Sequence, residues 1–335
     1  MRDVRAFICG CAGSSLTDDE RAFLRRAAPW GLILFARNIQ NRAQVKAIIE
    51  EFREISGRAD APVLIDQEGG RVQRLRPPEW RRYPAAADFN AAPEQERACL
   101  VRQGARLIAQ DLAEVGINVD CMPVIDVPAP GGHDVIGDRA YSDDPGLTAL
   151  LGRAACEGLL DGGVLPVVKH MPGHGRAGAD SHLALPVVSA SRRALETDFS
   201  TFQALSDMPI AMTAHVVYSA VDPDRPATLS PKVVSEVIRG EIGFDGLLMS
   251  DDLSMKALSG SFTEKTEGLF AAGLDMALYC WADLKEAEEV ARAAPILDGR
   301  RARRAARALE RLCPPQPFDA QAALARLDAA LPTRA

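Results

Sequence analysis

The chain has 335 residues, of which 47% are hydrophobic, 25% are charged and 5% are aromatic, and its formal net charge is −7. This length fits one large domain or two ordinary ones, and the apolar content is enough for a sizeable core. The acidic balance argues against nucleic acid or an anionic membrane as the main partner, and the few aromatic residues argue against a broad stacking platform for bases.

The sequence shows neither the pattern of an export signal nor that of a membrane-spanning segment. The chain has no run of about 18 apolar residues, so we expect no membrane-spanning segment. The stretch MRDVRAFICGCAGSSLTDDE has only a short apolar run before it turns acidic, which is not typical of a signal peptide. The seven cysteines are scattered, and their one close pair, Cys9 and Cys11, lacks the spacing of a zinc knuckle. We therefore expect buried thiols in a reducing cytoplasm.

Short apolar runs alternate along the chain with longer stretches of helical spacing. The runs are aliphatic or β-branched throughout, which is typical of parallel strands buried on both faces. We predict eight strands, at residues 6–10, 31–36, 62–67, 117–123, 164–170, 210–216, 246–251 and 275–280.

The stretches between the strands carry helix signals. Thr17 and Glu20 form a capping box, helices are predicted at residues 42–55 and about 93–115, and Ser230 before a proline is typical of an N-cap. Repeated strand–helix units predict an α/β fold, a (β/α)8 TIM-type barrel. A doubly wound open sheet is the alternative, and the pattern leaves room for one irregular or reversed strand near the N-terminus.

The pattern changes after residue 295. Five arginines crowd a predicted helix around residues 300–307, and a short helix is predicted at about 319–330. Because the chain is acidic, we interpret the arginines as the solvated face of a packed helix rather than as an RNA contact. We expect residues 1–295 to form the barrel and residues 296–335 to form extra C-terminal helices packed on it in the same domain.

Charged residues follow several of the predicted strands. Asp66 ends the third strand, Lys169 and His170 end the fifth, and Asp251 and Asp252 end the seventh. A single aspartate at a strand end is often a helix N-cap. Several charged ends together predict a functional site, because the sites of (β/α)8 barrels lie at the carboxyl ends of the strands.

The segment KHMPGHGRAGADSH, residues 169–182, holds three of the five histidines of the chain. Its glycines match G-x-G-x-x-G, but the segment runs on as a loop instead of opening a helix, so we do not expect a nucleotide site. His170, His174 and His182 could ligate a divalent ion. Against this, Pro172 prevents a helical H-x-x-x-H arrangement, and Lys169 would place a cation beside the metal.

Asp180 and His182 suggest a general acid/base. In an extended segment, side chains two apart point the same way, so the Asp180 carboxylate could accept a hydrogen bond from the His182 ring and fix its tautomer. The alternative is a histidine merely tethered in a loop. Asp251 or Asp252 is the candidate nucleophile, and only one of these neighbours is expected to face the substrate.

Five stretches together resemble glycoside hydrolase family 3, and within it the single-domain bacterial cytosolic β-N-acetylhexosaminidases of peptidoglycan recycling. The resemblance covers about residues 5–290. It rests on LIDQEGGRVQRL (64–75), VIGDRAYSDDP (135–145), VVKHMPGHG with ADSH (167–182), MTAHVVY (212–218) and GFDGLLMSDDLSM (243–255).

The resemblance implies a retaining exo-hydrolase that removes terminal β-N-acetylglucosamine from muropeptide-type substrates. Asp251 would be the nucleophile that forms a covalent glycosyl-enzyme, and His182 the acid/base, with Asp180 as its partner. The residues implied in sugar binding are Asp66, Arg74, Arg139, Lys169 and His170. We expect a cytoplasmic monomer that acts on a small-molecule sugar without metal, cofactor, nucleic acid or membrane.

Two other functions stay open at this point. The chain could be a metal-dependent barrel hydrolase that uses the loop histidines as ligands, or a sugar-binding protein that has lost catalysis. Met171 departs from the family pattern, in which an aromatic residue is frequent. His174 is assigned to holding the loop, and a contact of Arg176 with substrate is left undecided.

Overall fold

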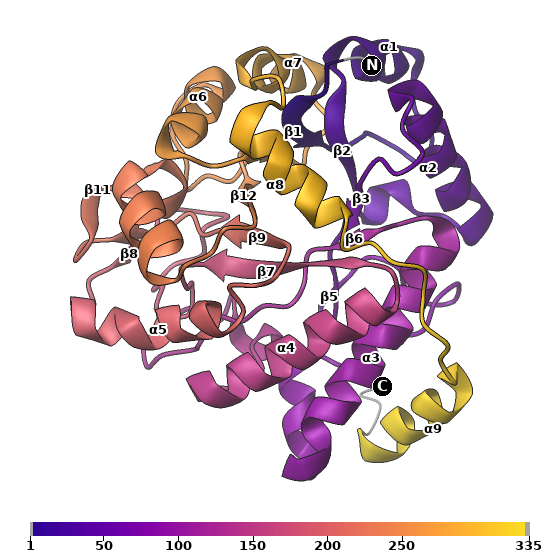
Figure 1. The fold of residues 1–335 in the computed structure, drawn as a ribbon, viewed down its shortest axis with the longest axis vertical. Helices are drawn as coiled ribbons and strands as arrows, with labels where there is room; N and C mark the ends of the chain where they lie inside the picture. Colours follow the sequence, from indigo (N-terminus) through magenta and orange to yellow (C-terminus); the bar gives the residue numbers. More distant parts are fainter. Residues whose placement is uncertain (1–2, 332–335) are drawn as a thin grey trace.

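The computed structural model describes residues 3–331 and contains a closed barrel of eight parallel strands (Figure 1). Around the barrel the order is β1-β13-β12-β9-β7-β6-β3-β2. The strands are β1 (Arg5–Cys9), β2 (Pro29–Leu34), β3 (Val63–Ile65), β6 (Val119–Asp120), β7 (Leu165–Met171), β9 (Ile210–Thr213), β12 (Leu247–Asp252) and β13 (Met276–Tyr279). Each overlaps one predicted run, so the predicted (β/α)8 barrel is confirmed and the doubly wound alternative is wrong.

Near the N-terminus the register shifts between β1 and β2, which pair in parallel like the other barrel strands, and Arg5 also forms an isolated antiparallel bridge with Ile296. Two small sheets lie outside the barrel. They are the hairpin of β4 (Gln67–Gly69) and β5 (Val72–Gln73), and a sheet of β8 (Val187–Val188), β10 (Val217–Tyr218) and β11 (Asp222–Pro226).

Helices surround the barrel. They are α1 (Asp18–Ala27), α2 (Arg42–Ser56), α3 (Glu94–Val115), α4 (Pro145–Asp161), α5 (Arg192–Ala204), a π-helix (Val233–Glu241), α6 (Phe262–Ala272), α7 (Leu284–Ala293), α8 (Gly299–Leu309) and α9 (Ala320–Ala330). Short 3-10 helices occupy Ala36–Asn38, Ala86–Ala91, Gly137–Arg139 and Ala227–Leu229. The Thr17 capping box is confirmed, and the Ser230 hydroxyl accepts the amide of Val233, as an N-cap does. None of the helices described is both long and apolar enough to cross a bilayer.

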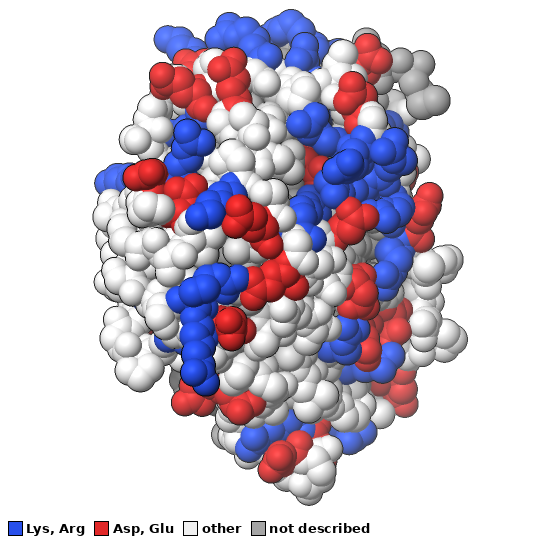
Figure 2. Space-filling view, turned by 60° about the vertical axis from the view of Figure 1, so that its left-hand side comes forward, with Lys and Arg blue, Asp and Glu red and all other residues white. Residues whose placement is uncertain are grey.

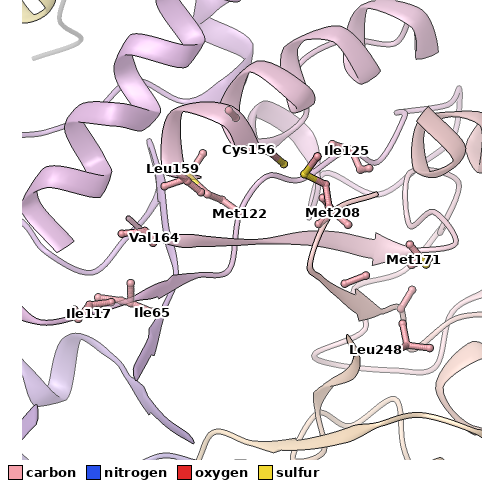
Figure 3. Packing of buried hydrophobic residues seen from close by; sticks show 14 of the residues in the cluster. Ile65, Ile117, Met122, Ile125, Cys156, Leu159, Val164, Met171, Met208 and Leu248 are labelled. Atoms are coloured by element: carbon pink, nitrogen blue, oxygen red, sulfur yellow. The ribbon is translucent and has the colours of Figure 1, made fainter. Parts of the chain in front are cut away.

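The two larger clusters of the core lie on opposite faces of the barrel strands, because successive strand residues point to opposite faces. Leu165 and Val167 of β7 belong to the cluster inside the barrel. Val168 belongs to the larger cluster between the barrel and the helices. Figure 3 shows this outer layer, where Cys156 and Leu159 of α4 pack near Met122 and Val164.

The helix α8 lies across the amino ends of the barrel strands. Ala305 and Ala308 pack into the inner cluster, and Arg304 is buried, with ion pairs to Asp275 (3.0 Å) and Asp245 (2.6 Å). The interpretation of this face as solvated is therefore wrong for Arg304. On the face shown in Figure 2, basic side chains likewise have acidic ones beside them.

The C-terminal helix α9 lies against α3 (Figure 1), where Leu327 and Ala323 are buried. The division of the chain at residue 295 into barrel and C-terminal helices stays a prediction.

Candidate active site

A cavity of about 310 Å³ opens at the carboxyl ends of the barrel strands. Most of the side chains that the sequence singled out line it: Asp66, Arg74, Arg139, Lys169, His170, His182 and Asp251. Asp180 does not line the cavity, but it reaches it through its contact with His182.

One wall of the cavity is a continuous chain of charges. Lys169 Nζ lies 3.0 Å from Asp66 Oδ1 and 2.7 Å from Glu68 Oε1. Asp66 also pairs with Arg74 (3.0 Å), and Glu68 holds Arg139 through two contacts of 2.8 Å. Charged residues from β4, β7 and the segments that follow β3, β5 and β6 are thus brought together in alternating sign, which keeps each buried charge paired.

Glu68 is the one residue of this charged wall that the sequence did not lead us to predict. It stands two residues after Asp66, and side chains two apart in an extended segment share a face. That spacing, applied to the DQEGG motif, could have identified it.

The alternation of charges fixes the protonation states of these groups. Burial raises the pKa of Asp66 and Glu68, but the cations beside them have the larger combined effect. Lys169 and Arg74 hold the pKa of Asp66 well below its usual range, and Arg139 and Lys169 lower that of Glu68 to about 2. Burial lowers the pKa of Lys169, but Asp66 and Glu68 raise it by more. At neutral pH all three are therefore charged, and they present fixed donors and acceptors to a polar ligand.

His170 is oriented by a buried carboxylate that the sequence reasoning did not select. Asp126 Oδ2 lies 2.7 Å from His170 Nδ1, and Asp126 Oδ1 accepts the backbone amide of His174 at 2.6 Å. The carboxylate holds the proton on Nδ1, which leaves Nε2 of His170 for the cavity. His174 contacts Ser181 Oγ through its Nε2 (3.0 Å), which agrees with its predicted role in holding the loop.

The two aspartates at the end of β12 differ in their surroundings. Asp252 is engaged in structure, since its carboxylate accepts the amide of Cys280 (3.0 Å) and the hydroxyl of Ser254. Burial raises the pKa of Asp252. Among residues 3–331, the Asp251 carboxylate accepts one hydrogen bond, from the amide of Asp252 at 2.8 Å.

The pKa of Asp251 is lowered. Burial raises it, but the imidazoles of His170 and His215 and the amide of Asp252 lower it by more. Asp251 is therefore an ionised carboxylate with free lone pairs in the cavity, as a nucleophile requires.

The predicted contact between Asp180 and His182 is present, but the geometry assumed for it is wrong. Asp180 Oδ1 accepts both the ring Nδ1 (2.8 Å) and the backbone amide (2.9 Å) of His182, and the Leu183 amide bonds to the Asp180 carbonyl. The segment is a turn closed by its own aspartate, not an extended strand. Burial raises the pKa of Asp180, and the amide and ring of His182 lower it by more.

The turn is attached to the strand that carries the candidate nucleophile. The carbonyls of Ser181 and His182 accept the amides of Ala257 (3.2 Å) and Lys256 (3.4 Å), which follow β12. The His182 side chain is 62% exposed, with Nδ1 committed to Asp180. Its Nε2 is thus free to exchange a proton with a ligand in the cavity.

Arg176, whose role was left undecided, points away from the cavity. Its guanidinium pairs with Asp198 at 2.5 Å and donates to the carbonyl of Ala194 on α5. It anchors the loop to the outer layer.

The loop histidines do not converge as metal ligands. Within residues 3–331, no group of three or more His, Cys, Asp or Glu side chains is arranged to hold a metal ion. One ring nitrogen of each loop histidine is instead committed to a different protein partner, Asp126, Ser181 or Asp180. The arrangement does not support the metal-dependent alternative.

Comparison with known proteins gives a consistent result. The profile of the glycosyl hydrolase family 3 N terminal domain matches residues 7–311. A beta-hexosaminidase of Alkalilimnicola ehrlichii is 39% identical over 280 residues, which cover 81% of this chain and 79% of that protein. A beta-hexosaminidase of Pseudomonas aeruginosa (strain LESB58) is 39% identical over 272 residues, 80% of each chain.

A similar solved structure is that of NagZ from Neisseria gonorrhoeae in complex with N-trifluoroacetyl-D-glucosamine. Its TM-score to this chain is 0.88, with 31% identity over 99% of both chains. A family 3 beta-N-acetylglucosaminidase from Paenibacillus has a TM-score of 0.80 and 32% identity over 97% of this chain and 61% of that one.

Proposed function

The chain belongs to glycosyl hydrolase family 3, as the sequence motifs indicated, and on this premise we propose that it removes terminal non-reducing β-linked N-acetylglucosamine with retention of configuration. The observation that carries the proposal is that an ionised Asp251 and a His182 oriented by Asp180 line the same cavity at the barrel mouth.

The reaction proceeds in two displacements. In the first, an Asp251 carboxylate oxygen bonds to the anomeric carbon while the glycosidic C–O bond breaks, and His182 Nε2–H gives its proton to the leaving oxygen. In the second, His182 takes a proton from water, the water oxygen bonds to the anomeric carbon, and the bond to Asp251 breaks. Asp180 accepts the hydrogen bond from Nδ1–H of His182 throughout and stabilises the imidazolium.

The charged wall binds the terminal sugar in this proposal. Asp66, Arg74, Arg139, Lys169 and His170 would hydrogen-bond its hydroxyl groups, since paired charges offer both donors and acceptors at fixed positions. Glu68 would hold Lys169 and Arg139 in place. A cavity of about 310 Å³ with one open side accommodates a single terminal sugar, which fits exo action.

The relatives support the N-acetyl sugar, because they are beta-hexosaminidases and the similar NagZ structure holds an N-acylated glucosamine derivative. We further propose that the natural substrates are muropeptide-type small molecules, and that the enzyme acts as a cytoplasmic monomer without nucleic acid or membrane as partner.

The decisive assay compares an aryl N-acetyl-β-glucosaminide with the matching aryl β-glucoside, with excess chelator present. We expect turnover of the first substrate, and loss of that turnover in Asp251→Ala with an unchanged circular dichroism spectrum. Wild-type rates in this variant would refute the assigned nucleophile. Turnover that needs added divalent ions would instead favour the metal-dependent hydrolase.

The acid role of His182 has its own test. His182→Ala should lose most activity on substrates with poor leaving groups and least on activated aryl glycosides, because only the former need protonation of the departing oxygen. An equal loss on both would contradict this role.

A further inference from the structure

Trp281 is exposed at the rim of the active-site cavity. The residue is 62% exposed, whereas the other two tryptophans, Trp30 and Trp80, are 2% and 3% exposed. It lines the same cavity as Asp251. An indole left in water at the mouth of a binding site marks a contact surface, because its large apolar face gains free energy when a ligand covers it.

The backbone next to Trp281 is fixed. The amide of Cys280 donates to Asp252 Oδ1 (3.0 Å), and the Cys280 carbonyl accepts Arg37 Nη2 (2.5 Å). Two residues further on, Asp283 caps α7 through the amide of Lys285 at 2.8 Å. The indole is therefore carried by a short segment held at both ends, which is the preorganisation that a binding surface needs.

The position of Trp281 separates it from the charged wall. It follows β13, which pairs with β12, the strand of Asp251. Around the barrel β13 lies three strands from β3, which Asp66 follows, and three from β7, which holds Lys169. The side chains of Lys169 and Glu68 are only 3% and 7% exposed, so the centre of the charged wall lies deep while the indole lies at the rim.

We propose that Trp281 is the stacking surface for the second sugar of the substrate, the one that leaves. This inference rests on the proposed function and refines it. The terminal sugar is bound by paired charges at the bottom of the cavity, so the leaving group emerges past the rim. A pyranose has one face lined by C–H groups, and that face covers an indole ring without losing hydrogen bonds. The favoured substrate is thus a disaccharide or a longer glycan rather than a simple alkyl glycoside.

Kinetics on two substrates test the proposal. N-acetyl-β-glucosaminyl fluoride has no sugar leaving group, whereas N,N′-diacetylchitobiose has one. In Trp281→Ala the ratio of kcat/KM for the disaccharide to that for the fluoride should fall about ten-fold. Trp281→Phe should restore most of the ratio, since it keeps an aromatic face. The control Leu150→Ala changes an exposed apolar residue outside the cavity and should keep the ratio. An unchanged ratio in Trp281→Ala would overturn the proposal.

A binding measurement tests the contact between Trp281 and the sugar without requiring turnover. Trp30 and Trp80 are buried, so acrylamide quenching of the Asp251→Ala variant reports on Trp281. The disaccharide should protect the indole from acrylamide, and N-acetylglucosamine should protect it much less. Equal quenching with and without disaccharide would overturn the stacking role. Protection by the disaccharide in a protein whose wild type hydrolyses neither substrate would retain Trp281 as a sugar contact and refute the hydrolase.

Discussion

Glu68 joins two cations, Lys169 and Arg139, that would otherwise face one another in a buried wall. Its side chain is only 7% exposed. Replacing Glu68 with glutamine leaves both cations short of an anionic partner, so we expect kcat/KM for the aryl N-acetylglucosaminide to fall about 100-fold.

The exposed pair of Arg71 and Asp138 provides the matched control. Asp138 is 38% exposed, and a surface ion pair contributes little. Asp138→Asn should therefore change kcat/KM less than about three-fold. Comparable losses in Glu68→Gln and Asp138→Asn would show that burial of the charge chain does not matter for activity.

The protonation of Asp251 makes the activity depend on pH. Its carboxylate is needed in the ionised form, so activity is present above its pKa and is lost as the pH falls through that value. Burial raises this pKa, and the His170 imidazole is among the groups that keep it below the usual range. His170→Asn should raise the pKa and move the acid limb of kcat/KM on the glycosyl fluoride to higher pH. An unmoved acid limb would assign that limb to another group.

At the scale of elements, the loop with the acid/base depends on a close backbone approach at Gly175. A Cβ placed there would lie 1.9 Å from the carbonyl oxygen of Val127, whereas one at Gly178 would meet nothing within 4 Å. Gly175→Ala must therefore shift the loop that carries His182. We expect at least about a ten-fold loss of turnover on a substrate with a poor leaving group, because small displacements of a catalytic group are costly.

Gly178→Ala, on the same loop, should keep turnover close to that of the wild type. The comparison needs steady-state rates and a thermal unfolding curve for each variant. If Gly175→Ala is as active as Gly178→Ala, the position of the loop does not control the acid/base step.

At the scale of the whole molecule, Arg304 connects α8 to the segments that precede β12 and β13. Arg304→Ala leaves Asp275 buried with only Arg239 as its ionic partner among the described residues. We expect the free energy of unfolding in urea to fall by about 3 kcal/mol. Arg303→Ala, an exposed change on the same helix, should cost less than about 0.5 kcal/mol. Equal costs would mean that α8 contributes no buried ion pair to stability.

Local patterns in the sequence predict the barrel strands and many of the residues of the site. Unbroken apolar runs identified all eight barrel strands, and charged residues at strand ends identified Asp66, Lys169, His170 and Asp251 as lining one cavity. These features are predictable because a strand buried on both faces needs continuous apolar sequence, and because the carboxyl ends of the strands in a barrel share one face. The family motifs then indicated the class of reaction.

Only the tertiary structure shows which residues pair with the charged side chains. Lys169 meets Asp66 across 103 residues of sequence, and Glu68 meets Arg139 across 71. The sequence contains no periodicity that selects Asp126 to hold His170, or that buries Arg304 while Arg303 stays exposed. Even the contact of Asp180 with His182 was predicted with the wrong backbone, since a turn and a strand both bring these side chains together. A local pattern fixes which face of an element is apolar, but the pairing of charges depends on which elements the closed barrel makes neighbours.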